Sequence, residues 1–421
     1  MNPARSDNRR PIPVRGKPGP GQRWILAGQV LTVAMAMLML PSPAWALPSE
    51  RPDDTWQVNG PVRAIVKAGR TIFIGGDFTQ LRANPIGQGG RVIRVSNIAA
   101  LNADTGRPSR RVDVPRLTGR SSIVYALTVA DGKVWIGGRF SAADGKVRHN
   151  IASIDAGTGA VRKFRPRVSG DVWSLADDGK KVYAGGTFDT VNGRARKRLA
   201  AFSAATGNLN RRWTPGANNR VRDMGVTPDR TGLFVTGSFG TVTDPGGRRW
   251  ARNRIALLST STGRDRGWIP EGSASSSPSV FGMGVTPQGN RLYWSTGGPD
   301  WVAAFNIDTG SRIWKTETDG TVGDAIEFGN RVIIGGHFVL VSPSPGGPGC
   351  ATHPETCVRH IRIAALGLNG VLDQSWDAKL QGKGVEWEGA RRFLVDGNRL
   401  WVVGEFIQIT DVPQNYIGRL S

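Results

Sequence analysis

The stretch KVWIGGRFSAADGKVRHNIASIDAGTGAVRKFRP (residues 133–166) decides the fold, because its parts return along the chain at a regular interval. Its central phrase, WIGGRF, ends at Phe140. Related phrases are FIGGDF ending at Phe78, YAGGTF at Phe188, FVTGSF at Phe239, IIGGHF at Phe338 and VVGEF at Phe406, with the degenerate copy RLYWSTGG at residues 291–298. Spread from Phe78 to Phe406, these copies repeat about every 55 residues, near the 40–50 typical of propeller blades once loops are allowed for.

Each copy has three companions with the apolar or alternating pattern of β-strands. An apolar segment precedes the GGxF phrase, as in VYALTV (residues 124–129), and a third segment follows it, as in NIASIDAGTG (residues 150–159). After the TG turn a shorter segment carries an aromatic residue; these residues are Phe164, Trp213, Trp268, Trp314 and Trp376. Four strands per repeat is the content of one propeller blade.

The sequence therefore predicts an all-β fold, a seven-bladed β-propeller of four-stranded blades over residues 47–421. Stacked blades bury each other's faces, and a closed ring has no long free edges. The last repeat stops in its third strand, NYIGRLS (residues 415–421), whereas DDTWQVNGPV (residues 53–62) has the fourth-strand pattern. We expect this N-terminal strand, with Trp56, to complete the last blade and close the ring.

These phrases resemble those of the delta-60 repeat (DUF5122) β-propeller family, which consists of secreted bacterial proteins largely without assigned activity. The resemblance rests on GGxF, NIAxID and TG followed by an aromatic residue, and it extends over residues 47–421. It implies the fold and supplies no catalytic residues, since propellers carry many unrelated functions.

Residues 1–46 have the organisation of a signal peptide. Basic residues precede an apolar run at residues 25–40, and Ala44-Trp45-Ala46 offers a small-x-small cleavage site. We expect cleavage after Ala46 and secretion to the extracellular space or cell envelope, with no membrane span left in the mature chain.

The formal net charge of +22 favours acidic partners. An acidic polymer, a glycan or a protein at the cell surface is the expected partner, and nucleic acid is not, because the basic residues are scattered and form no long run. A compositional preference for arginine is the alternative explanation of this charge.

The two cysteines, Cys350 and Cys357, predict a disulfide in an exported protein. A metal site with His353 and His360 would not match a standard zinc spacing, so we expect no metal.

No cofactor is expected either. The phrase AFNIDTGSRIW (residues 304–314) is similar to the tryptophan-docking motif of quinoprotein dehydrogenases, but we interpret it as shared blade structure. Asp324, Glu386 and Glu388 enter neighbouring inner strands, and paired carboxylates there would suit a glycosidase.

Ligand binding is expected where the inner strands begin. One column of aligned positions lies there: Arg63, Tyr125, Trp173, Arg222, Phe281, Asp324 and Arg391. Aromatic rings flanked by guanidinium groups suit an anionic sugar or another flat acidic ligand, through stacking and bidentate hydrogen bonds. We therefore expect a secreted, non-enzymatic binding or scaffold module, with an extracellular carbohydrate-active enzyme, a glycoside hydrolase or lyase, as the alternative.

Overall fold

The computed structural model describes residues 46–272, 281–298, 300–384 and 388–421, with strand positions but not side chains described at 281–283. The predicted signal peptide, residues 1–46, lies outside the described residues except for Ala46. The described residues contain no helix of the length and apolar character that a membrane crossing requires.

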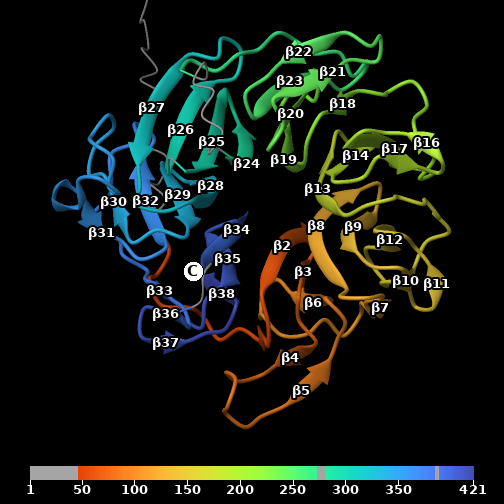
Figure 1. Cartoon of the computed structure of the whole chain (residues 1–421). Coiled ribbons are helices and arrows are strands. Elements are labelled where there is room, and N and C mark those ends of the chain that lie inside the picture. Colours follow the sequence, from red (N-terminus) through yellow and green to blue (C-terminus); the bar gives the residue numbers. More distant parts are fainter. Residues whose placement is uncertain (1–45, 273–280, 299, 385–387) are drawn as a thin grey trace, which may run out of the picture. The chain divides into compact units, whose positions relative to one another are not determined.

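Antiparallel sheets make up the described chain, and the larger ones share one strand order (Figure 1). In each, the strand that carries the GGxF phrase lies between the apolar strand before it and the strand after it. The sheets are β2 (Val62–Ala68), β3 (Thr71–Gly76), β6 (Ile98–Asn102); β8 (Ile123–Ala130), β9 (Lys133–Arg139), β12 (Ile151–Asp155); β13 (Val172–Asp177), β14 (Lys181–Gly186), β17 (Leu199–Ser203); β19 (Val221–Val226), β20 (Gly232–Gly237), β23 (Ile255–Ser259); β24 (Phe281–Gln288), β25 (Arg291–Gly297), β26 (Trp301–Asn306), β27 (Arg312–Glu317); β28 (Val322–Phe328), β29 (Arg331–Gly336), β32 (Ile363–Gly367); and β34 (Gly389–Asp396), β35 (Arg399–Glu405), β38 (Ile417–Leu420).

Among the described residues, a full fourth strand is present in the sheet that contains β27. In other sheets it is reduced to one antiparallel bridge, and these bridges are Leu101 with Pro108, Ile154 with Val161, Phe202 with Leu209, Leu258 with Asp265, and Leu366 with Leu372. Proline explains one of these short pairings, because it has no N–H to donate to a ladder. Pro108 stands in the bridge itself, while β27 (RIWKTE) contains no proline.

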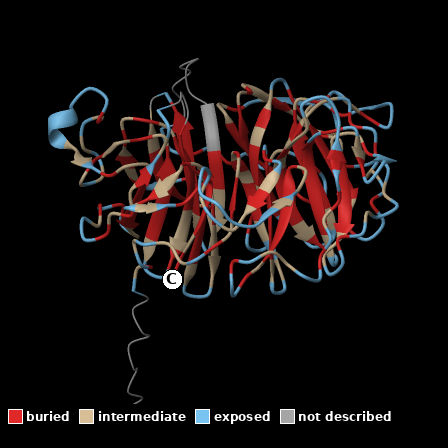
Figure 2. Ribbon diagram, turned by 90° about the horizontal axis from the view of Figure 1, so that it is seen from below, coloured by how far each residue is buried: buried red, intermediate tan, exposed pale blue. Residues whose placement is uncertain are grey.

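The hydrophobic core lies between neighbouring sheets. The strands are largely buried, and the loops that connect them are largely exposed (Figure 2). The first glycine of each GG pair permits this packing: a Cβ on Gly137 of β9 would lie 2.7 Å from the Val172 side chain of the next sheet. Gly75, Gly185 and Gly335 meet the next sheet in the same way. The repeated glycine in the sequence therefore marks the closest approach of two sheets.

The first strands follow one another in the packing. The contacting pairs are β2 and β8, β8 and β13, β13 and β19, β19 and β24, β24 and β28, β28 and β34, and β34 and β2.

The N-terminal segment lies along the outer edge of β38. The N–H of Ser49 donates to the carbonyl of Ser421 (3.0 Å), and the N–H of Asp53 donates to the carbonyl of Arg419 (2.7 Å). The strand predicted to make this pairing covers residues 53–62, whereas the bonds to β38 come from Ser49 and Asp53. Within the predicted range, β1 (Gln57–Val58) pairs with β4 (Gln80–Arg82) instead. Trp56 is half-buried, and it packs against the core between the first large sheet (β2, β3 and β6) and the last one (β34, β35 and β38).

The predicted disulfide is present. Cys350 and Cys357 are bonded, with an S–S distance of 2.13 Å, in the loop between β30 (Leu340–Val341) and β31 (Val358–Arg359).

Candidate functional site

A β-bulge interrupts the first strand of each large sheet near its start. In β2 the register passes from Val62 to Ala64, so Arg63 is the extra residue. The residues left out of the register in this way are Arg63, Tyr125, Trp173, Arg222, Gly323 and Arg391. A bulge re-aims the extra side chain out of the regular alternation. Its place is tied to the second glycine of GG, since a Cβ on Gly76 would lie 2.1 Å from the Pro61 carbonyl oxygen.

The bulged residues meet in one pocket of about 100 Å³, here called the central pocket. It is lined by Arg63, Tyr125, Trp173, Arg222, Gly323, Arg391 and Arg392. The structure thus brings together Arg63, Tyr125, Trp173, Arg222 and Arg391 of the predicted column.

Two members of that column are placed differently. Gly323, not Asp324, is the bulged residue of β28, and Asp324 is buried one position further on. In β24 the register passes from Gly282 to Val285, so Phe281 precedes the bulge and pairs with Gly297, while its side chain lies outside the described part of the chain. Aligning apolar patterns does not show where the extra residue of a bulge falls, which explains both shifts.

Aromatic and guanidinium groups form a continuous stack in the pocket wall. The rings of Tyr125 and Trp173 lie 4.8 Å apart at an interplanar angle of 10°. The Arg63 guanidinium lies over Tyr125, 5.9 Å from the ring centroid, and that of Arg220 lies over Trp173 at 4.4 Å. Arg222 is also near Trp173, at 6.0 Å. The stack follows the chain, with Arg63, Tyr125, Trp173 and Arg222 coming from successive first strands.

The Glu405 carboxylate contacts two of the arginines that line the pocket. Arg391 donates from Nε to Glu405 Oε1 (2.9 Å), and the Arg63 guanidinium lies 3.9 Å from the same oxygen. Burial and the nearby Arg63 charge lower the pKa of Arg391 to about 10, against the opposing effect of Glu405. Burial and Arg220 likewise lower the pKa of Arg222. In both cases burial has the larger effect, and the neighbouring guanidinium charge lowers the pKa further.

Arg392 connects the pocket to a layer of carboxylates. Its guanidinium lies 2.9 Å from Asp223 and 3.9 Å from Asp324, and it donates to the Gly323 carbonyl (3.2 Å). Asp223 accepts from the N–H of Val285 (3.1 Å), and Asp324 accepts from that of Phe393 (2.9 Å).

The pKa values in this layer reflect burial and charge together. Burial raises the pKa of Asp324 to about 6 even though Arg392 opposes the rise, and burial also raises that of Asp223. For Arg392, burial lowers the pKa, but the two carboxylates outweigh it and the net shift is upward.

Of the carboxylates considered for catalysis, the two that the structure describes, Asp324 and Glu388, do not form an exposed pair. Asp324 faces Arg392, and Glu388 is ion-paired with Arg362 at 2.9 Å. Glu386 lies outside the described residues. Within the described ranges no group of three or more His, Cys, Asp or Glu residues is arranged to hold a metal ion.

The prediction from sequence omitted Arg220, Asp223, Arg392 and Glu405. Proximity in the sequence was the available signal for the first three, since Arg220 lies two residues before Arg222, Asp223 follows Arg222 directly and Arg392 follows Arg391. In the phrase VVGEF, Gly404 takes the place of the second glycine and Glu405 that of the variable residue before Phe406, and no local pattern marks Glu405 as a partner of Arg391.

Larger crevices, of about 570 to 600 Å³, lie along the short fourth segments, and two of them also border a turn region of the neighbouring sheet. One is lined by Trp135, Phe164 and the turn at Gly207, and a second by Trp268 and Ile307. The central pocket is smaller but concentrates charge from several sheets, so it is the stronger candidate site.

No protein-family model and no curated protein sequence matches the chain. Among solved structures, U3-55K matches with a TM-score of 0.51 at 12% identity, over 88% of this chain and 99% of that one. The computationally designed Ika8 protein matches with a TM-score of 0.48 at 13% identity, over 87% and 92%. At such low identity, a structural match shows the fold and nothing more. Together with the repeated antiparallel sheets, the match shows that the chain has the β-propeller fold.

Proposed function

We propose that this chain is an exported, seven-bladed β-propeller of the delta-60 repeat type that binds an acidic polymer, such as an acidic glycan or cell-wall polymer, at its central pocket without acting as an enzyme. Its mature form begins at residue 47. The observation that carries the binding proposal is the gathering of Arg63, Arg222, Arg391 and Arg392 around one pocket.

The packing order supports seven blades in a closed ring. Each large sheet contacts the next through its first strand, and the last such strand, β34, contacts the first, β2. Closure in this way leaves no sheet of the series without a neighbour on each side.

The turn glycines support closure by the N-terminal segment. A Cβ on Gly207 would meet Phe164 of the preceding blade, and one on Gly370 would meet Trp314. A Cβ on Gly106 of the first blade would meet Thr55 at 2.7 Å. This likeness supports a place for the N-terminal segment equivalent to that of the fourth segments elsewhere.

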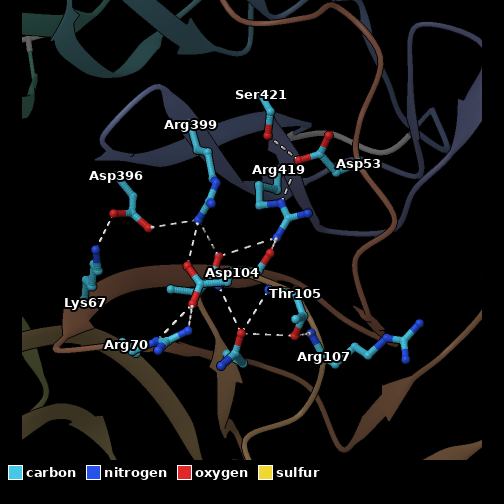
Figure 3. A network of polar contacts seen from close by, with 12 residues as sticks. Asp53, Lys67, Arg70, Asp104, Thr105, Arg107, Asp396, Arg399, Arg419 and Ser421 are labelled. Carbon is cyan, nitrogen blue, oxygen red and sulfur yellow. Dashed lines mark hydrogen bonds and ion pairs between the residues drawn. The ribbon is translucent and has the colours of Figure 1, made fainter.

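The first and last sheets are joined by the kind of contact that joins other neighbouring sheets, from a basic residue of one sheet to a backbone carbonyl of the next (Figure 3). Lys133 donates to the Ala204 carbonyl of the next sheet (3.2 Å), and Lys181 donates to that of Thr260 (3.1 Å). Arg399, at the start of β35, donates to the Ala103 carbonyl (3.2 Å) and to Asp104 (3.2 Å). The last sheet therefore meets the first as neighbouring sheets meet elsewhere.

The test is binding of residues 47–421 to immobilised acidic polysaccharides and wall teichoic acid, with a neutral polysaccharide as reference, at about 150 mM salt so that long-range attraction is screened. We expect Trp173→Ala and Arg222→Ala to weaken binding about ten-fold or more, which corresponds to about 1.4 kcal/mol. Release of sugar products from the same panel would instead support the carbohydrate-active enzyme.

The chain offers a matched control. Trp250 on β22 (Arg249–Ala251) carries the Arg248 guanidinium 3.9 Å from its ring centroid, outside the pocket. Trp250→Ala and Arg248→Ala remove the same chemistry and should leave binding unchanged. Equal losses in both pairs of variants would locate binding in general surface charge and refute the proposed site.

A further inference from the structure

We infer that the central pocket binds a compact tetrahedral oxoanion, a sulfate or phosphate group, at the edges of its guanidinium groups, and that it does not hold a flat ring by stacking. This inference rests on the proposed function for the polymer that carries the group. It also replaces the expectation that a ligand stacks on Tyr125 and Trp173.

The ring faces are already covered by the protein. Tyr125 and Trp173 cover one face of each other at 4.8 Å. Arg63 lies over Tyr125, and Arg220 lies over Trp173. Since Arg63, Tyr125 and Trp173 come from successive blades, the cations lie on the outer sides of the aromatic pair. A ligand ring would have to displace an arginine before it found a free face.

The guanidinium groups approach the pocket from different strands, which favours a ligand whose acceptor oxygens face several directions. Arg63, Arg222 and Arg391 reach the pocket from β2, β19 and β34. Arg63 Nε and Trp173 Nε1 are buried and have no acceptor among the described residues. A planar carboxylate satisfies one guanidinium fork well, whereas a tetrahedral oxoanion offers oxygens to forks that approach from different sides.

The local charge balance also favours an anion. Arg392 pairs with Asp223 and Asp324, and Arg63 and Arg391 both lie beside the carboxylate of Glu405. Arg63, Arg222, Arg391 and Arg392 all line the pocket, so an oxoanion there would lie close to several guanidinium charges.

The size of the pocket suits a small ligand group. Its volume of about 100 Å³ is well below the roughly 300–1,000 Å³ of pockets that enclose drug-sized ligands. A group of a few heavy atoms at the end or side of a polymer fits this space.

The experiment titrates residues 47–421 with inorganic sulfate, inorganic phosphate and benzoate in separate series, at constant ionic strength set with chloride. Binding is followed by calorimetry, and each ion is also tested for displacement of the acidic polymer. We expect sulfate or phosphate to bind and displace the polymer, and benzoate to do neither. The stronger of the two oxoanions distinguishes a sulfated glycan from a phosphodiester polymer.

A charge-conserving variant tests the fork geometry. Arg222→Lys should weaken oxoanion binding about ten-fold, because lysine lacks the planar fork, and Arg248→Lys should have no effect. Melting temperatures within a few degrees of the wild type would show that both variants fold.

The outcomes separate this inference from the proposed function. Polymer binding that depends on Arg222, but that benzoate displaces as well as sulfate or that neither oxoanion displaces, would overturn the inference and leave the proposed function standing. Oxoanion binding without polymer binding would support the inference and refute the proposed function. Failure of both kinds of ligand would refute both.

Discussion

Replacing Asp324 should change how the stability of the protein depends on pH. Asp324 is only 6% exposed, and burial raises its pKa from the ordinary value of 3.8 to about 6. The charged groups that face it are Arg392 on β34 and Asp223 on β19, with the Thr286 hydroxyl of β24 at 3.3 Å. The folded chain therefore holds a proton that the unfolded chain has already lost between these two pKa values.

The sign and size of the effect follow from this difference. Because the folded state binds the proton more tightly, this group stabilises the protein fully below about pH 4, and the contribution is lost as the pH rises through about 6. A shift from 3.8 to about 6 corresponds to about 3 kcal/mol at 1.36 kcal/mol per pKa unit. We expect Asp324→Asn to gain about that much stability relative to the wild type between about pH 4 and pH 7.

Urea unfolding followed by tryptophan fluorescence at several pH values measures this difference. Asp229→Asn is the control: hydrogen bonds from Thr227 and Thr231 lower the pKa of Asp229 to about 2, so above its ordinary value it is ionised in both states. The control should therefore run parallel to the wild type. A difference between Asp324→Asn and the wild type that stays constant over this range, or that shrinks as the pH rises, would refute the reasoning.

Three further predictions concern the scaffold. Replacing Cys350 and Cys357 by serine should destabilise their loop by about 2–3 kcal/mol on the chain-entropy estimate, seen as faster cleavage in limited proteolysis; an unchanged cleavage rate would argue against it. Gly335→Ala should lower the free energy of unfolding by about 1–3 kcal/mol, because the new Cβ would lie 2.4 Å from the Phe393 ring. A Cβ on Gly240 meets open space, so the control Gly240→Ala should unfold like the wild type. Equal unfolding midpoints for the two variants would show that the sheets can move apart without cost. Deleting residues 47–58 should cost about 3–5 kcal/mol through the lost burial of the Trp56 region and the exposed edge of β38, and an unchanged unfolding midpoint would contradict closure by this segment.

The fold was predictable because its cause is local and repeated. The first glycine of GG recurs since a Cβ there would strike the next sheet, as Gly75 against Val124 shows. The apolar strands on either side must be buried on both faces and therefore stand out in the sequence. The reduced fourth strands were less predictable, because a segment such as the one that begins at Pro108 keeps its apolar pattern while losing ladder hydrogen bonds.

The site was predictable only where side-chain type and bulge position coincided. Arg63 and Trp173 were identified because each lies at the bulge of its strand. Asp324 was assigned one position away from Gly323, since a bulge adds a residue without changing the apolar pattern around it. The pairing of Arg392 with Asp223 joins strands about 170 residues apart, and no spacing rule of a single strand specifies such a contact.

A crystal structure of residues 47–421 grown in selenate would test anion binding at the central pocket most directly. Selenate is a tetrahedral oxoanion, and anomalous scattering locates its selenium atom without reference to neighbouring density. We expect a selenium peak within hydrogen-bonding reach of Arg63, Arg222 and Arg391, with Tyr125 and Trp173 still stacked on each other. Selenium found only at surface arginines such as Arg248, with water in the pocket, would contradict it.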